Sequence, residues 1–187
     1  AAAVEVLASP ANASVLLGNP FVRAVHEMPR HGRGDFLARL RRRGFDLLID
    51  PYWSWDLAWA RTAGAIGARQ SLGLDLHGRG LYYNVRVPAA GLPSLPAAEL
   101  MLEICRRGLG RPLRSRPAKI YVQPGEREAA LRFLDQSGLD IKKPLVLIHP
   151  GGHYLEQRWP AERFAETAGG LLRAGNWRVA AVGGPAD

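Results

Sequence analysis

Cysteine is nearly absent from this sequence: of its 187 residues, Cys105 is the one cysteine. A single thiol cannot form a disulfide within the chain, which excludes a disulfide-stabilised extracellular scaffold and fits a reducing compartment. No apolar run approaches the roughly 18 residues that a membrane-spanning helix needs, and no signal-peptide pattern is found. With 47% hydrophobic and 22% charged residues, the composition is that of an ordinary globular protein, and we expect a cytoplasmic one.

Acidic residues are outnumbered, with 17 Asp and Glu against 25 Lys and Arg, which gives a formal net charge of +8. The excess is compatible with a solvated arginine-rich surface, or with attraction to an anionic lipid surface or an anionic substrate. Arg39, Arg41, Arg42 and Arg43 close a predicted helix, where cations suit the helix dipole; a membrane-facing patch is the alternative. Basic motifs interleaved with aromatic residues are not found, so we expect no nucleic-acid partner.

Predicted strands and helices alternate along the chain. Strands are expected at residues 4–7, 22–26, 45–49, 70–74, 83–87, 145–148 and 177–182, and a strand or an extended segment at residues 119–122. Helices are expected at residues 11–17, 36–43, 55–62, 97–109, 124–137 and 161–174, with Asp35 and Ser54 as N-caps and Pro160 at a first helical position. This alternation predicts an α/β fold with mainly parallel sheets. The arginine- and proline-rich stretch 110–117 predicts a linker.

The stretch from Leu145 to Pro160, LVLIHPGGHYLEQRWP, is the most informative in the chain. A short apolar run ends in Pro150-Gly151-Gly152, a polar loop follows, and Trp159-Pro160 leads into a predicted helix. The helix N-terminus after a glycine loop carries free N–H groups and a partial positive charge, which suit a phosphate. The two glycines predict either a tight turn or a close backbone approach to a phosphate.

Several motifs together resemble those of the heptosyltransferases, glycosyltransferase family 9. Towards the end of the chain they are Pro150-Gly151-Gly152, Arg158-Trp159-Pro160, Glu162-Arg163-Phe164 and Gly183-Gly184-Pro185. Towards its start, Gly18-Asn19-Pro20 and the stretch FDLLID at residues 45–50 are similar to the family's GNP and YDLVID segments. The resemblance spans nearly the whole chain.

The resemblance implies a GT-B type fold: two Rossmann-like domains with mainly parallel sheets, both incomplete in this chain. Residues 1–117 would form the N-terminal, acceptor-side domain without its first strand, and residues 118–187 the start of the C-terminal nucleotide-sugar (donor) domain. The protein would transfer heptose from a nucleotide-heptose of the ADP-heptose type to the lipopolysaccharide inner core, an anionic acceptor. Peripheral contact with the inner membrane is a further expectation. The protein's general base, an Asp, would lie upstream of Ala1, so this chain alone is expected to be inactive.

Site residues follow from the matching positions. The residues predicted to bind the donor are Gly151, Gly152, Gln157, Arg158, Gly184 and Asp187. Those predicted to contact the acceptor are Asp50, at the carboxyl end of a strand where ligand sites of α/β proteins gather, together with Arg79 and Arg86. The alternative for Asp50 is a turn or cap carboxylate, and the alternative for Arg158 is an ordinary surface charge. We expect no metal and no cofactor, since His149 and His153 have no partner at a metal-ligand spacing.

Two positions depart from the family pattern. Gln157 stands where the family usually has Lys, and Pro51-Tyr52 follow the FDLLID stretch where the family usually has Leu-Gln, which points to a different acceptor side. The alternatives to a heptosyltransferase are another GT-B glycosyltransferase or a UDP-sugar epimerase, and a non-catalytic nucleotide-binding module. A dinucleotide enzyme is disfavoured, because no G-x-G-x-x-G follows a strand.

Overall fold

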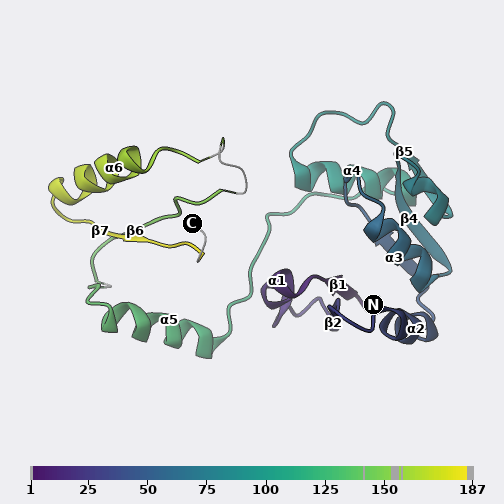
Figure 1. The fold of residues 1–187 in the computed structure, drawn as a ribbon, viewed down its shortest axis with the longest axis horizontal. Helices are drawn as coiled ribbons and strands as arrows, with labels where there is room; N and C mark the ends of the chain where they lie inside the picture. Colours follow the sequence, from purple (N-terminus) through teal and green to yellow (C-terminus); the bar gives the residue numbers. More distant parts are fainter. Residues whose placement is uncertain (1, 141, 153–155, 157, 185–187) are drawn as a thin grey trace. The chain divides into compact units, whose positions relative to one another are not determined.

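The chain forms two compact units in the computed structural model, Ala1–Tyr121 (unit 1) and Val122–Asp187 (unit 2). The structure describes residues 2–140, 142–152, 156 and 158–184. Figure 1 shows that an extended segment links α4 of unit 1 to α5 of unit 2. The predicted linker, 110–117, lies in that segment.

Unit 1 holds two parallel sheets. The first is the pair β1 (Glu5–Ala8) and β2 (Ala24–Glu27); the second has the order β3 (Leu47–Asp50), β4 (Gln70–Asp75) and β5 (Val85–Pro88). Its helices are α1 (Pro10–Ala13), the 3-10 helix η1 (Ser14–Leu16), α2 (Arg33–Arg42), α3 (Ala58–Ile66), the 3-10 helix η2 (Arg79–Tyr82) and α4 (Ala97–Leu109). All strand pairs in both sheets are parallel, as the alternation of strands and helices predicts.

The main core of unit 1 lies between the three-stranded sheet and α4. Leu72 and Leu74 of β4, Val87 of β5 and Ile104 of α4 are almost fully buried and form one cluster. Gly108 lets α4 approach the sheet closely, because a Cβ there would lie 2.2 Å from Leu72 Cδ1. This core fixes β4 and β5, and with them the segment between them that carries η2.

A cluster of charged side chains lies on the two-stranded sheet of β1 and β2. The carboxylate of Glu5 accepts hydrogen bonds from His26 Nε2 at 2.8 Å and Arg43 Nη2 at 2.6 Å. Only 7% of the Glu5 side chain is exposed. The hydrogen bonds of His26 and then Arg43 hold the pKa of Glu5 below its ordinary value of 4.5. Because the folded state favours the ionised form, Glu5 stabilises the fold above pH 4.5 and loses that contribution as the pH falls through the lowered pKa.

We therefore expect Glu5→Gln to lower the free energy of unfolding by about 1–2 kcal/mol at neutral pH, since it weakens charge-assisted hydrogen bonds to a partly exposed arginine. The difference from the wild type should shrink below pH 4.5. Denaturant unfolding measured between pH 3.5 and 7 tests this, with Glu27→Gln, an exposed glutamate on β2, as the control. A constant difference over that range would contradict the assignment.

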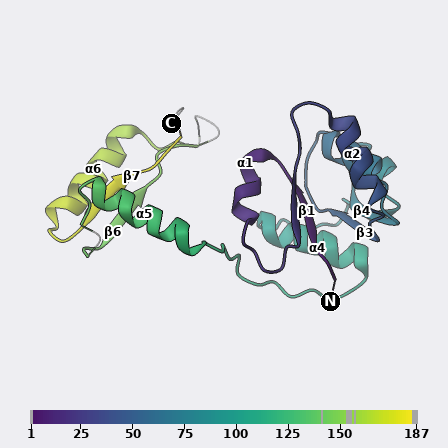
Figure 2. The ribbon, with the colours of Figure 1, turned by 90° about the horizontal axis from the view of Figure 1, so that it is seen from below.

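Unit 2 contains α5 (Pro124–Gln136), β6 (Leu145–Ile148), α6 (Ala161–Arg173) and β7 (Arg178–Ala181). The two strands pair in parallel, from Leu145 opposite Arg178 to Ile148 opposite Ala181. Helix α6 connects them and packs against β7 (Figure 2). The strand–loop–helix–strand unit expected from the sequence is therefore present.

Several local expectations were wrong. Asp35 lies inside the first turn of α2, whose N-cap is Gly32 in the left-handed conformation, because glycine adopts that conformation without a steric penalty. Ser54 belongs to a turn, and α3 begins only at Ala58. Pro160 is the N-cap of α6 and not its first residue. Of the two alternatives for residues 119–122, the structure has the extended segment and not the strand.

Candidate functional site

A buried polar cluster lies at the carboxyl end of β3. Asp50 Oδ2 accepts hydrogen bonds from Arg79 Nη2 at 2.8 Å and from the Tyr83 hydroxyl at 2.5 Å. The Arg79 side chain is 0% exposed and that of Asp50 is 11% exposed. We call these three residues the Asp50 cluster. Burying an ion pair costs solvation, so a cluster of this kind persists only where geometry and additional hydrogen bonds are good.

Arg79 donates hydrogen bonds to both other members of this cluster and to the loop that follows β3. Its Nη1 donates to the backbone carbonyl of Asp56 at 2.7 Å, and its Nη2 also donates to Tyr83 Oη at 3.2 Å. Burial, and then the hydrogen bond to Asp50, raise the pKa of Tyr83, so its hydroxyl stays protonated and donates. In unit 1 Arg79 is therefore a positioning residue for the loop that follows β3.

That loop, residues 51–57, is here called the aromatic loop because it carries Tyr52, Trp53 and Trp55. Its start is held by the Tyr52 N–H, which donates to Asp50 Oδ1 at 3.2 Å. Its end is held by Arg79, which donates to the Asp56 carbonyl, and the Asp56 carboxylate accepts the N–H of Ala58, the first residue of α3. Trp55 stacks on His77 with ring centroids 3.9 Å apart.

The residues predicted to contact the acceptor thus have different surroundings. Asp50 and Arg79 bind each other, and a fully buried guanidinium has no surface for a ligand in this conformation. Arg86 is exposed on β5, with its Nε donating to the carbonyl of Tyr83 at 3.3 Å. Acceptor contact by Asp50 and Arg86 stays a prediction, whereas the geometry gives Arg79 a role in holding the loop.

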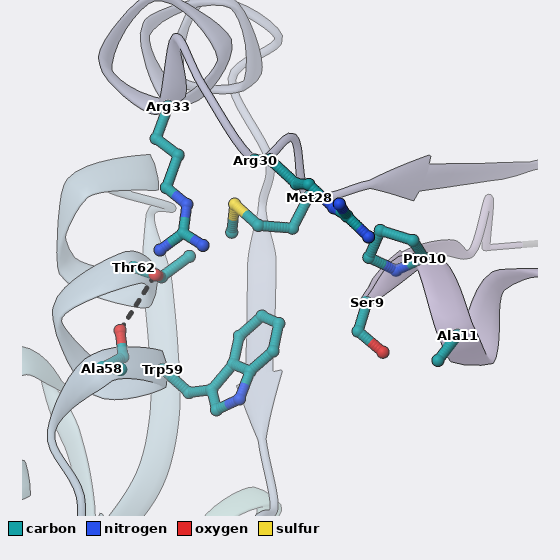
Figure 3. Close-up of a pocket in the computed structure, with 9 residues that line it drawn as sticks. All are labelled: Ser9, Pro10, Ala11, Met28, Arg30, Arg33, Ala58, Trp59 and Thr62. Atoms are coloured by element: carbon teal, nitrogen blue, oxygen red, sulfur yellow. Dashed lines mark hydrogen bonds between the residues drawn. The ribbon is translucent and has the colours of Figure 1, made fainter. Parts of the chain in front are cut away.

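A pocket of about 450 Å³ adjoins the aromatic loop in unit 1. It is lined by Ser9, Pro10, Ala11, Met28, Arg30, Arg33, Ala58, Trp59 and Thr62. Figure 3 shows Arg33 reaching towards Thr62, with Met28 and the Trp59 ring between that side and Ser9. The pocket combines an aromatic ring, a thioether and cationic groups, as small-molecule sites commonly do, and sequence reasoning did not identify it.

In unit 2 the glycine loop, residues 149–152, connects β6 to the segment that precedes α6. Arg158 Nε donates to the carbonyl of Gly152 at 3.0 Å, and this is the one hydrogen bond of its guanidinium found among the described residues. Trp159 packs edge-on against Phe164 of α6 with centroids 5.0 Å apart, and half of it is exposed. Arg158 is therefore tied to the glycine loop just before a helix N-terminus.

The structure describes some of the other residues predicted to bind the donor and not the rest. Gly151 and Gly152 are half-buried in the glycine loop, and Gly184 is exposed after β7. Gln157 and Asp187, like the loop residue His153, lie outside the described residues. Their roles stay predictions.

Neither a metal-binding group nor a membrane-spanning helix is found in the described residues. Within the described part of the chain, no group of three His, Cys, Asp or Glu residues could hold a metal ion. In the same residues, no helix is both long and apolar enough to cross a membrane.

Parallel strands joined by helices, polar side chains at strand ends and a glycine loop before a helix define a Rossmann-like α/β protein. Two solved structures share this fold: a family 9 glycosyltransferase from Veillonella parvula, with a TM-score of 0.79 and 22% identity, and ADP-heptose lps heptosyltransferase II of E. coli, with 0.75 and 19%. Each match covers 99% of this chain, but only 54% and 56% of the respective structure. The predicted GT-B type is thereby confirmed.

Residues 33–187 match glycosyltransferase family 9 (heptosyltransferase), and the chain belongs to that family. The family resemblance predicted from the sequence is therefore correct. A search of curated protein sequences finds no significant match. The chain spans little more than half the length of the two structures, so it corresponds to part of the full fold.

Proposed function

We propose that this chain forms the acceptor-side domain and the start of the donor domain of a heptosyltransferase. The enzyme would transfer heptose from an ADP-heptose type donor to the inner core of lipopolysaccharide. Membership of a heptosyltransferase family supports the class of reaction. The observation that carries the donor side is the hydrogen bond from Arg158 to Gly152, which sets a cation beside a glycine loop and a helix N-terminus.

In the proposed reaction an acceptor hydroxyl displaces the nucleoside diphosphate from the anomeric carbon of the heptose. A carboxylate acting as general base takes the proton of that hydroxyl. Negative charge develops on the departing diphosphate, and the free N–H groups at the start of α6 together with Arg158 would stabilise it. We expect the reaction to need no metal ion.

The test is transfer by a protein that carries the complete fold, followed by mass spectrometry. Heptose-deficient lipopolysaccharide serves as acceptor, and ADP-heptose is compared with UDP-glucose and UDP-N-acetylglucosamine. Transfer from ADP-heptose alone, unchanged by a chelator, is the expected result. Transfer only from a UDP-sugar would indicate another GT-B glycosyltransferase, and nucleotide binding without transfer would indicate a non-catalytic module.

The positive net charge supports a further part of the proposal, peripheral contact with the inner membrane. With a formal net charge of +8, the protein would favour an anionic acceptor and the anionic cytoplasmic face of the inner membrane. Arg39, Arg41, Arg42 and Arg43 are all exposed at the end of α2, where they would provide such a surface. Peripheral contact predicts binding to vesicles that contain phosphatidylglycerol, weakening as salt rises.

Arg158→Ala should weaken donor binding by a factor of roughly 10 to 100, since one charge-assisted hydrogen bond contributes about 1.5–3 kcal/mol. Calorimetric titration with ADP-heptose measures it. Arg173→Ala, which removes an exposed cation in the last turn of α6, is the matched control and should have a small effect. Equal losses for the two variants would place the diphosphate away from Arg158.

A further inference from the structure

The aromatic loop is an unusual place for large apolar side chains. Tyr52, Trp53 and Trp55 are 47%, 40% and 72% exposed, although they fall within four consecutive residues. Single exposed aromatic residues are common, but a cluster of them marks a surface that binds something. No role in the core explains the cluster, so its exposure requires another reason.

The loop is held rigidly enough to present these rings in a fixed arrangement. Both of its ends are fastened to the Asp50 cluster, at the start through Asp50 and at the end through Arg79 and Asp56. A further internal hydrogen bond joins the Asp56 N–H to Ser54 Oγ at 3.1 Å. A surface that is ordered before binding loses less conformational entropy when the ligand arrives.

Trp55 is supported from one side only. His77 stacks against one face of its ring with an interplanar angle of 25°, yet 72% of the residue remains exposed, so the opposite face is open. His77 has a φ of 50°, a conformation that costs a non-glycine residue energy and is concentrated at functional sites. The backbone strain is thus located at the residue that supports the exposed ring.

The location favours a sugar as the ligand. The loop follows the carboxyl end of β3, the edge at which parallel α/β sheets bind ligands, and it leads into Ala58 and Trp59, which line the neighbouring pocket. The C–H groups on one face of a pyranose ring are apolar and weakly positive, and they complement the electron-rich face of an indole. Cations lie in the pocket, at Arg30 and Arg33, and not on the loop.

We propose that Trp55, with Tyr52 and Trp53 beside it, is a stacking platform for a pyranose ring of the acceptor saccharide and contributes to acceptor specificity. The inference rests on the proposed function, because it takes the acceptor to be a saccharide. In this arrangement the loop binds the apolar face of a sugar, while the adjoining cationic pocket accepts an anionic group of the same acceptor.

The test is calorimetric titration of a protein that carries the complete fold with a deacylated lipopolysaccharide inner-core oligosaccharide. Trp55→Ala should weaken binding roughly threefold to tenfold, the effect of losing one aromatic stacking contact. Trp55→Phe keeps a ring and should retain most of the affinity. Phe21→Ala removes an aromatic residue of the same exposure, 72%, and should change nothing. Thermal unfolding of each variant checks that the fold is intact.

Two further measurements separate the explanations. Titration of the same variants with ADP-heptose reports on unit 2: if it binds while Trp55→Ala leaves oligosaccharide affinity unchanged, the platform is refuted and the proposed function stands. If the oligosaccharide binds through Trp55 but ADP-heptose does not bind, the platform stands and the proposed donor is wrong. Vesicles of phosphatidylglycerol that bind through Trp55, with no oligosaccharide binding, would overturn the proposal in favour of a membrane contact.

Discussion

Replacing Arg79 with Met should lower the free energy of unfolding of unit 1 by about 3–5 kcal/mol, the usual cost of removing one partner from a buried ion pair. The side chain is 0% exposed, and its loss leaves the Asp50 carboxylate, itself 11% exposed, without its cation. The aromatic loop also loses its attachment through Asp56. The loss should therefore exceed that of any exposed arginine in the unit.

Denaturant unfolding measures the effect, with Arg114→Met, at an exposed position of the same unit, as the control. Asp50→Asn combined with Arg79→Met should be less destabilising than the sum of the two single changes, because the double variant buries no unpaired charge. If Arg79→Met cost no more than Arg114→Met, the buried ion pair would not exist in solution.

Gly73→Ala should destabilise unit 1 by about 1–3 kcal/mol, the range found when atoms are forced into a packed core. Gly73 on β4 pairs with Asp50 on β3, and the ring of Tyr83 crosses over it to reach Asp50. An added Cβ would lie 2.4 Å from both Cε2 and Cζ of that ring. The ring would have to move, which breaks the hydrogen bond of its hydroxyl to Asp50.

Gly34→Ala is the matched control, because a Cβ at this position in α2 meets nothing within 4 Å and alanine favours a helix. It should leave stability unchanged or raise it by up to about 1 kcal/mol. Thermal and denaturant unfolding of both variants measure these changes in stability. A Gly73→Ala protein as stable as the wild type would show that the Tyr83 ring does not cross β4.

Local signals in the sequence predicted the elements that depend on neighbouring residues. The helix expected at 97–109 has those bounds because an amphipathic run lies between Pro96 and Gly110, the two cap residues. The strand at 145–148 was equally clear from its apolar run and the glycine loop after it. Gly151, Gly152 and Arg158 could likewise be predicted to lie in one loop region, because the family motifs that contain them are close together in the sequence.

Features that depend on distant partners could not be predicted. Arg79 was predicted to contact the acceptor, since nothing in its sequence neighbourhood indicates that it pairs with Asp50, 29 residues earlier, in the core. Tyr83 was not predicted as a site residue, although the HGRGLYYN stretch that contains it follows a strand with a central glycine, Gly73. Residues 119–122 have the composition of a strand, but a strand also needs a partner, and they pair with no described strand.

The strand arrangement of unit 1 affects the tendency of the protein to aggregate. β3 pairs with β4 along one edge, and no strand of the described residues pairs with its other edge. Leu47 and Ile49, which share one face of β3, are each 39% exposed. An open apolar edge of this kind is a template on which a second molecule can add a strand. The formal charge of +8 opposes such aggregation by mutual repulsion. Because added salt screens that repulsion, the purified chain should remain dispersed best in dilute, low-ionic-strength buffer.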